Sequence, residues 1–231
     1  QKYPQYKNVR TTTAIGGKGI EVLGHLYDIW IAGAGFNEEL VRQANEMDKL
    51  LWSYDCGLAT VDAENSRYYF GLWCWKIGIK GCALWAYADP GSTSSDAWDG
   101  ILKDLQNTEL HYSFVRPTPE DLVPTIGWEA AREGVDDHRY MTTLSALIVQ
   151  AKAAGVQAPL ARAQRVLMEI SDEIDVNGYS AGAKAGGATQ RRLGVLYDRP
   201  SPQDNMVKGD YDRFRYRIAQ EIIRLQKALE E

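Results

Sequence analysis

Aromatic and acidic residues gather at the ends of two short apolar segments of this chain, Leu51 to Cys56 and Gly81 to Ala88. An aromatic ring can stack against the apolar face of a sugar, and a carboxylate can accept hydrogen bonds from hydroxyls or transfer a proton. If both segments are parallel strands, their carboxyl ends meet at one sheet edge, where ligand sites of α/β proteins lie. The sequence therefore predicts a ligand pocket lined by Tyr54, Asp55, Trp85, Tyr87 and Asp89.

The aromatic candidates also have a structural interpretation. Trp85 and Tyr87 alternate with aliphatic residues and share one strand face, so core packing explains them as well as ligand contact does. Trp52 and Tyr54 pose the same choice, and Tyr54 is favoured for the pocket because it lies nearer the carboxyl end of its strand. Trp30 completes the predicted lining, although its position in the middle of a strand favours the core.

The two acidic candidates, Asp55 and Asp89, end adjacent predicted strands. Their carboxylates are therefore expected near each other, where they can bind sugar hydroxyls or shift each other's pKa. A retaining pair of glycosidase carboxylates needs a separation of about 5 Å, and an inverting pair needs more. Capping of the following loop is the alternative, and it is favoured for Asp89, which precedes Pro90.

Four strands and two helices are predicted around these residues. Apolar and β-branched runs predict the strands, and apolar side chains three or four residues apart predict the helices. Strands joined through such helices are parallel with right-handed crossovers, which form either a (β/α)8 TIM-type barrel or an open doubly wound sheet. The strands are Val9–Ile15, Leu26–Ala32, Leu51–Cys56 and Gly81–Ala88, and the helices are Phe36–Lys49 and Ser66–Ile77.

The chain changes character after Asp89. Residues 90–100 form a small-residue loop long enough to line a site, and residues 176–209 are polar and rich in Gly, Ala and Pro, which predicts irregular structure. We expect residues 1–123 to hold the sheet and its site, and residues 124–231 to form a helical extension packed on it. Four helices are predicted there, Thr125–Val135, Asp137–Ala154, Pro159–Asp175 and Tyr211–Leu225.

Composition disfavours several classes of protein. The chain has 231 residues, 45% of them hydrophobic, and can bury a sizeable core. Its net charge of -5, with Lys and Arg interspersed among acids, provides no basic surface for nucleic acid or an anionic membrane. No apolar run approaches the roughly 20 residues that span a bilayer, and the first residues lack the apolar core of a signal peptide.

No metal and no cofactor are predicted. Cys56, Cys74 and Cys82 are too few and too widely spaced for a disulfide framework or a zinc site, and the latter two are expected to be buried free thiols. The histidines share no metal-ligand spacing with carboxylates. The Gly-Ala-Gly turn at 33–35 imitates a dinucleotide fingerprint, but Glu38 holds the place of the third glycine and disfavours a bound pyrophosphate.

Other acidic residues are assigned structural roles. The dipeptides Glu120-Asp121 and Asp172-Glu173 lie away from strand ends and are expected to be solvated surface. For the most charged helical cluster, ion pairs that dock a helix on the sheet are favoured over catalysis. That cluster comprises Arg132, Glu133, Asp136, Asp137 and Tyr140.

Several segments, taken in order, resemble a known family. They are LWSYDCG, then Arg67 leading into YYFGLWCWKIGIKGCALWAYAD, then PTIGWEAAREGVDDHRYMTTL, and the closing helix YDRFRYRIAQEIIRL. Their order and spacing are similar to the C-terminal portion of glycoside hydrolase family 123 and of the related catalytic-domain family called domain of unknown function 4091. The similarity covers Leu51 to Leu144 well and the last helix loosely.

The resemblance implies that this chain is the C-terminal half of a (β/α)8 barrel, with the other half upstream of Gln1, in a separate chain or replaced by a second copy. It also implies a substrate-assisted retaining hydrolysis of N-acetylhexosamine-containing glycans, in which an Asp-Glu pair after the fourth barrel strand orients the N-acetyl group. That strand is not in this sequence, so no residue is assigned a catalytic role. An extracellular or periplasmic location, as a secreted protein, follows from the resemblance alone.

The leading hypothesis is therefore a glycoside hydrolase-like protein that acts on or binds carbohydrate. A non-catalytic structural or assembly protein that reuses the barrel is the first alternative, because a fold does not determine a function. A nucleotide-binding α/β domain is the second alternative.

Overall fold

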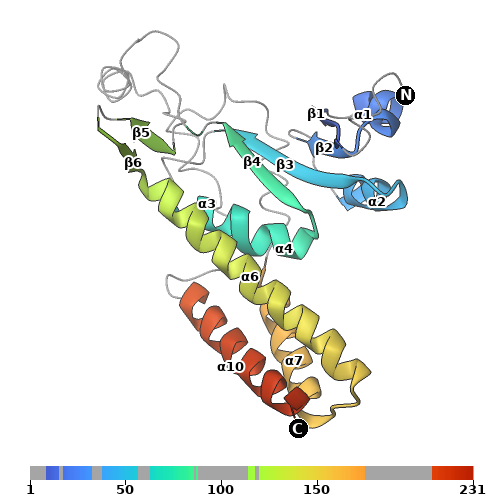
Figure 1. The fold of residues 1–231 in the computed structure, drawn as a ribbon, viewed down its shortest axis with the longest axis vertical. Coiled ribbons are helices and arrows are strands. Elements are labelled where there is room, and N and C mark those ends of the chain that lie inside the picture. The colour runs from blue at the N-terminus through green and yellow to red at the C-terminus, as the bar shows by residue number, and fades with distance from the viewer. Residues whose placement is uncertain are drawn as a thin grey trace.

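The computed structural model describes residues 9–15, 18–32, 38–56, 63–85, 87, 114–117, 120–174 and 210–230. These residues form a mixed α/β fold with a four-stranded parallel sheet at one end (Figure 1). Three long helices form a bundle at the other end: α6 (Ile126–Ala153), α7 (Ala158–Glu173) and α10 (Asp210–Glu230). Helix α6 runs from the sheet end into the bundle and so connects the two parts.

The strands of the sheet lie in chain order, and each pairs in parallel with the next. The order is β1 (Thr12–Ala14), β2 (Ile29–Ala32), β3 (Leu50–Cys56) and β4 (Gly81–Trp85). The predicted parallel sheet is thus confirmed; β1, β2 and β4 are shorter than predicted, and β3 begins one residue earlier than predicted. A closed barrel is not part of the described structure.

The two faces of the sheet differ in burial. Trp30 and Ala32 pair with Leu51 and Ser53, and all four lie on one face with at most 4% of their surface exposed. Cys82 shares this face, and its Sγ lies 3.5 Å from the carbonyl oxygen of Tyr69. The opposite face is half-buried and mostly apolar; it carries Ile29, Ile31, Leu50, Trp52 and Tyr54.

Trp30 is held in the core by the turn that precedes its strand. Its indole Nε1 donates a hydrogen bond of 2.9 Å to the carbonyl oxygen of Gly24, and the ring is fully buried. The predicted second strand begins too early at Leu26, because residues Gly24–Leu26 form a 3-10 turn after α1 (Lys18–Leu23). No part of the Trp30 surface is exposed, which agrees with the alternative that Trp30 belongs to the core.

The helices between the strands follow the predicted pattern with changed ends. Helix α2 (Glu38–Glu46) lies between β2 and β3. Between β3 and β4, α3 (Ala63–Tyr68), a π-helical turn η3 (Tyr69–Trp73) and α4 (Cys74–Ile77) follow one another without a break. Gly78 ends this run, as predicted, with a left-handed φ of 79° that glycine adopts without strain.

The C-terminal part contains one helix where two were predicted. A break at Asp136 does not occur, because Arg132 and Arg139 on neighbouring turns pair with its carboxylate and the helix continues. An antiparallel hairpin, β5 (Val115–Pro117) and β6 (Leu122–Pro124), precedes α6 and was not predicted. The predicted boundary between residues 123 and 124 falls inside β6.

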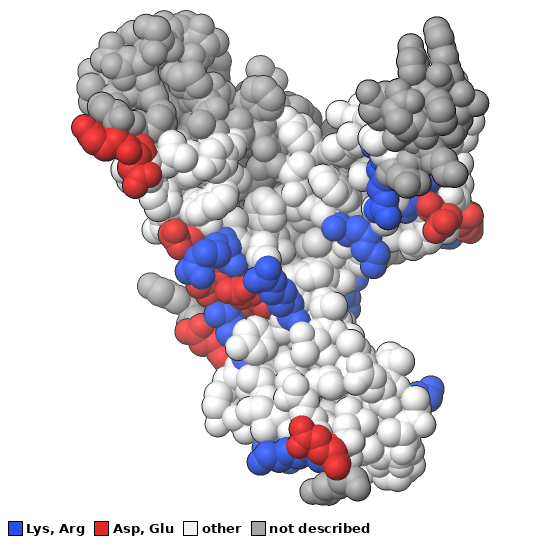
Figure 2. Space-filling model, viewed as in Figure 1, with Lys and Arg blue, Asp and Glu red and all other residues white. Residues whose placement is uncertain are grey.

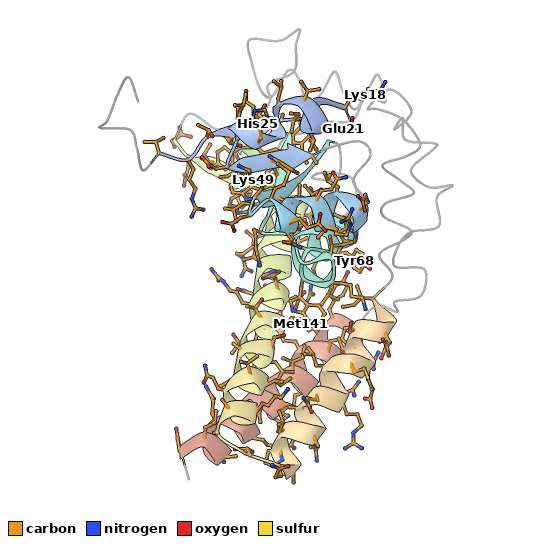
Figure 3. The ribbon with its side chains drawn as sticks, turned by 90° about the vertical axis from the view of Figure 1, so that its right-hand side faces the viewer. Lys18, Glu21, His25, Lys49, Tyr68 and Met141 are labelled. Atoms are coloured by element: carbon orange, nitrogen blue, oxygen red, sulfur yellow. The ribbon has the colours of Figure 1, made fainter. Side chains whose placement is uncertain are left out.

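One hydrophobic core runs through both parts, from Trp30 beneath the sheet to Leu225 in the bundle. Tyr68 and Met141, labelled in Figure 3, are both fully buried where α3 meets α6. The backbones approach closely there: a β-carbon on Gly134 of α6 would lie 2.3 Å from the carbonyl oxygen of Arg67. Helix α6 therefore packs directly on α3.

An ion-pair network reinforces this contact. Arg67 of α3 donates to both carboxylate oxygens of Asp137, at 2.6 and 3.1 Å, and Arg215 of α10 donates to Oδ1 of the same carboxylate at 2.6 Å. Arg215 also donates to Oε2 of Glu133 at 2.8 Å. Figure 2 shows charged side chains of both signs gathered where these helices meet. The contacts support the docking role predicted for the cluster.

The network predicts a dependence of stability on pH. Arg215 donates a hydrogen bond to Glu133 and thereby lowers the pKa of this carboxyl, and the charges of Arg215 and Arg132 act in the same direction. Because the pKa is lower in the folded protein, the stabilisation is complete above the unfolded value of about 4.3 and is lost as the pH falls through the folded value.

We therefore expect the melting temperature to fall on acidification below about pH 4.5, and to fall less in a Glu133→Gln variant. Thermal unfolding followed by circular dichroism over a series of acidic buffers measures this. Glu120→Gln is the control, since Glu120 is exposed and makes no ion pair within the described part of the chain. Identical profiles for wild type and Glu133→Gln would contradict the expectation.

None of the described helices combines the length and the apolar character needed to cross a membrane.

Candidate functional site

A row of aromatic side chains leads from the end of β4 into the core. Tyr87 contacts Trp128 edge-on at 5.6 Å between ring centroids, and Trp128 contacts Phe114 in the same way at 5.8 Å. Phe70 of η3 lies 6.1 Å beyond Phe114. Tyr87 and Trp128 are 52% and 38% exposed, whereas Phe114 is buried. The row therefore presents two rings at the surface and anchors them on buried ones.

Backbone hydrogen bonds fix the segments that carry these rings. The carbonyl oxygen of Tyr87 accepts hydrogen bonds from the amides of Phe114 and Val115, at 3.1 and 3.0 Å. The carbonyl oxygen of Phe114 accepts one from the amide of Thr125 at 2.8 Å. Thr125 is the N-cap of α6, and its Oγ1 accepts from the amide of Trp128 at 3.3 Å. Each exposed ring is thus attached to ordered backbone.

The predicted site residues fall partly within this region. Tyr87 lies just beyond the carboxyl end of β4, as predicted, and half of its surface is exposed. Tyr54 is half-buried on the same sheet face as Trp52 and pairs with Ala83 of β4. The backbones of Asp55 and Trp85 lie in β3 and β4, opposite Leu84 and Cys56 respectively.

The remaining predicted positions are outside the described structure. The side chains of Asp55 and Trp85, and the whole of Asp89, belong to this group, so the distance between the two predicted carboxylates is not defined. The loop at 90–100, the irregular stretch at 176–209 and the Gly-Ala-Gly turn at 33–35 are also outside it. The two acidic dipeptides are exposed, as predicted; Glu173 pairs with Arg213 at 2.7 Å.

Sequence reasoning missed Trp128. It stands in the first turn of a helix, and nothing in its local spacing indicates that the helix begins beside the end of β4. The hairpin β5–β6 brings it there, because Thr125 follows β6 directly and bonds back to Phe114. The sequence signal that could have identified Trp128 was a tryptophan in the first turn of a predicted helix, where an apolar side chain often faces solvent.

The two cysteines whose side chains the structure describes do not form an open reactive site. Cys74 is buried, and Cys82 is half-buried; both are free thiols. A hydrogen bond from Cys82, with a smaller contribution from His138, lowers the pKa of Cys74 to about 6, and burial raises the pKa of Cys82. The prediction of a buried free thiol is confirmed for Cys74, which is the first residue of α4.

No cluster of three or more His, Cys, Asp or Glu side chains within the described ranges is arranged to hold a metal ion. The exposed rings therefore define what the site can do chemically: they offer an apolar surface with one phenol hydroxyl and one indole N–H. Such a surface can pack against a flat apolar group and exchange hydrogen bonds with polar groups at its edge.

Comparison with known proteins adds no relative. No protein-family model matches the chain, and no curated protein sequence matches it significantly. The resemblance to glycoside hydrolase family 123 therefore stays a prediction from the quoted segments.

Proposed function

We propose that this protein binds carbohydrate at the carboxyl edge of its parallel sheet, as the C-terminal half of a glycoside hydrolase-like (β/α)8 barrel. The observation that carries the proposal is the pair of exposed rings, Tyr87 and Trp128, at the end of β4. Trp128 packs on the buried ring of Phe114, and Tyr87 packs on Trp128, so a ligand that stacks on the two rings does not have to order them first. Exposed aromatic surface of this kind is typical of binding sites.

The winding of the sheet supports the barrel. Right-handed crossovers that always step in the same direction place every connecting segment on the same face of the sheet. A doubly wound sheet instead reverses direction and carries helices on both faces. Here the order is β1-β2-β3-β4 without reversal, and the face with Ile31, Trp52 and Tyr54 is only half-buried. That face corresponds to the barrel interior, which the other half of the barrel would cover.

The proposal includes a substrate class. N-acetylhexosamine-containing glycans would bind at this edge and be hydrolysed by substrate-assisted retention, with the acidic pair supplied by the other half of the barrel. Tyr87 and Trp128 would hold a sugar ring, and Tyr54 would face the barrel interior near the reacting bond. An extracellular or periplasmic location belongs to the same proposal. On this basis we expect this chain alone to bind sugars without hydrolysing them.

Binding is tested directly by titrating the protein with N-acetylglucosamine and with its β-linked dimer. The chain has seven tryptophans, so the part of the fluorescence change that is lost in Trp128→Ala reports on Trp128, and calorimetry gives the affinity. We expect saturable binding, with Tyr87→Ala and Trp128→Ala each weakening it about tenfold, which corresponds to the loss of one aromatic contact of about 1.4 kcal/mol.

Tyr216→Ala is the matched control. Tyr216 is 68% exposed and lies on α10 in the helical bundle, so its loss removes an exposed ring without touching the sheet edge. Equal weakening by Tyr216→Ala would reveal non-specific stacking. Absence of saturable binding by either sugar, in a protein with the expected helical circular dichroism, would overturn the proposal.

A further inference from the structure

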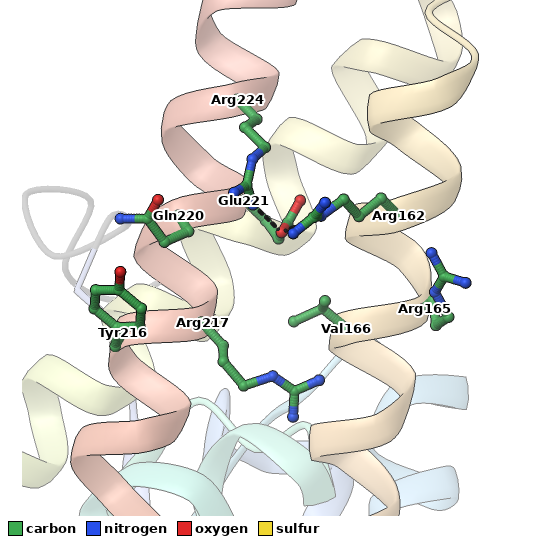
Figure 4. A pocket seen from close by; sticks show the side chains of 8 residues that line it. All are labelled: Arg162, Arg165, Val166, Tyr216, Arg217, Gln220, Glu221 and Arg224. Atoms are coloured by element: carbon green, nitrogen blue, oxygen red, sulfur yellow. Dashed lines mark hydrogen bonds and ion pairs between the residues drawn. The ribbon is translucent and has the colours of Figure 1, made fainter.

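Four arginines line a cavity between helices α7 and α10. The cavity has a volume of about 310 Å³. Arg162 and Arg165 belong to α7, and Arg217 and Arg224 belong to α10. Figure 4 shows Arg162 and Arg224 directed at Glu221 from the two helices. A concentration of guanidinium groups stands out in a chain whose net charge is -5.

The arginines outnumber the carboxylates that pair with them. Arg162 donates to Oε1 of Glu221 at 2.9 Å through its Nε, and Arg224 donates to the same oxygen. These two arginines therefore share one negative charge. Arg165 is exposed and forms no ion pair with any described residue. Positive charge is left over among the described residues at the cavity, which therefore attracts an anionic group.

The paired guanidinium groups are held in place before a partner arrives. Glu221 is 2% exposed, so it anchors Arg162 and Arg224 from the core side. Glu169 pairs with Arg217 in the same region. The three paired arginine side chains still keep between 29% and 53% of their surface exposed. Each guanidinium group has five N–H donors and can bind a further carboxylate, and ordered side chains lose less entropy on binding.

An exposed stripe on α10 borders the cavity. Tyr216, Gln220 and Ile223 are three or four residues apart and therefore share one face of the helix. Tyr216 and Ile223 are 68% and 46% exposed. Tyr216 and Gln220 also line the cavity, so the stripe and the arginines form one continuous surface. Tyrosine and arginine are enriched where proteins bind one another, and they carry much of the binding energy there.

An acidic amphipathic helix fits this surface. Its carboxylates would accept paired, charge-assisted hydrogen bonds from the arginines. Its apolar side chains would cover the ring of Tyr216 and the side chain of Ile223, as in helices that lie in a groove and insert anchors at helical spacing. A nucleic-acid strand fits less well, because the Glu169 side chain is 46% exposed beside Arg217 and would repel phosphate groups.

We propose that the face of α7 and α10 that carries this cavity docks an acidic amphipathic helix of a partner protein. The acidic side chains of the partner would lie over the arginines, and its apolar side chains would lie on Tyr216 and Ile223. This face belongs to the helical bundle and does not include Tyr87 or Trp128, so the proposal is independent of the proposed sugar site.

A synthetic helix tests the proposal. The probe is a dye-labelled peptide of 16 residues, the length of α7, with leucines three and four residues apart and glutamates on both sides of them. Fluorescence anisotropy follows its binding to the whole chain. We expect saturable binding that weakens as salt is added, and at least tenfold weaker binding when lysine replaces every glutamate. Equal binding of the two peptides, or no binding of the glutamate peptide, would overturn the proposal.

A charge reversal locates the binding surface. Arg165→Glu changes an exposed residue of the cavity and should weaken binding of the glutamate peptide about tenfold. Arg139→Glu is the matched control, because it makes the same change of charge at an exposed position of α6 outside the cavity and should leave the affinity unchanged. Equal effects of the two variants would show that net charge alone drives binding, and would overturn the proposal.

Two tyrosine variants separate this face from the proposed sugar site. Tyr216→Ala should weaken binding of the glutamate peptide about tenfold and leave sugar binding unchanged, and Tyr87→Ala should do the reverse. A labelled oligodeoxythymidylate with the same negative charge as the glutamate peptide is the last probe. Tighter binding of the oligonucleotide than of the peptide would overturn the proposal and assign the face to nucleic acid.

Discussion

Replacing Asp137 by alanine is expected to lower the free energy of unfolding by about 3–5 kcal/mol, the cost of removing one partner from a buried ion pair. The Asp137 carboxylate is 4% exposed and accepts hydrogen bonds from Arg67 and Arg215, which come from α3 and α10. Without this carboxylate, the guanidinium groups of Arg67 and Arg215 remain in the contact between the helices and lose the acceptor that they share. Arg215 retains Glu133, whereas Arg67 loses its close acidic partner and, among the described residues, keeps only Asp212, at 4.0 Å.

Chemical denaturation measures the difference, and Asp136→Ala supplies the matched control. Asp136 precedes Asp137 on α6 and also pairs with arginines, but its partners Arg132 and Arg139 are exposed residues on the same helix. Exposed pairs of this kind contribute about 0.2–1 kcal/mol. Comparable losses for the two variants would show that the buried network is no stronger than a surface pair, and would contradict the docking role assigned to it.

The same network shows where reasoning from sequence succeeds and where it stops. Charge density along one segment was enough to predict that the cluster around Asp137 docks a helix, because a helix that carries so many charges needs partners. The partners themselves were not predictable: Arg67 and Arg215 lie far from Asp137 in the chain, one on either side of it. Tertiary packing alone brings the three side chains together.

Local sequence patterns likewise predicted which segments form strands better than they predicted where each strand begins and ends. The apolar runs at β2, β3 and β4 were recognisable, and their order followed from the crossover rule. The start of β2 was placed too early because the apolar residue Leu26 belongs to a turn held by the Trp30 indole, a contact that depends on how the ring packs. Strand termini are set by such neighbours, which a pattern of residue types does not contain.

The exposed ring pair Tyr87 and Trp128 and the buried carboxylate of Glu221 on α10 differ in how far the sequence could have revealed them. Tyr87 was predicted from its place after a strand, whereas Trp128 joins it only through the hairpin that precedes α6. Glu221 had a local signal that was overlooked, since a glutamate interrupts an otherwise apolar stripe on α10. A charged residue in a core position is therefore easier to detect from sequence than an exposed aromatic residue, because it contradicts the apolar pattern around it.

Replacing Gly134 by alanine is expected to lower the free energy of unfolding by about 1–3 kcal/mol or more, as overpacking does in a closely packed interior. A β-carbon there would lie 2.3 Å from the carbonyl oxygen of Arg67, and one on Gly71 would lie 2.8 Å from the carbonyl oxygen of Gly134. Both contacts involve backbone, so neither neighbour can move without shifting a helix. Alanine should otherwise stabilise a helix interior by about 1 kcal/mol relative to glycine, so the two effects have opposite signs.

The sign of the change in the free energy of unfolding therefore shows whether overpacking or helix propensity dominates. Thermal or chemical unfolding of Gly134→Ala measures this change. Val135→Ala is the control, because it truncates a partly exposed side chain at the next position of α6 and should have a small effect. A more stable Gly134→Ala protein would show that α6 and α3 are not in backbone contact. A less stable protein would show that the close approach of α6 and α3 outweighs the higher helix propensity of alanine.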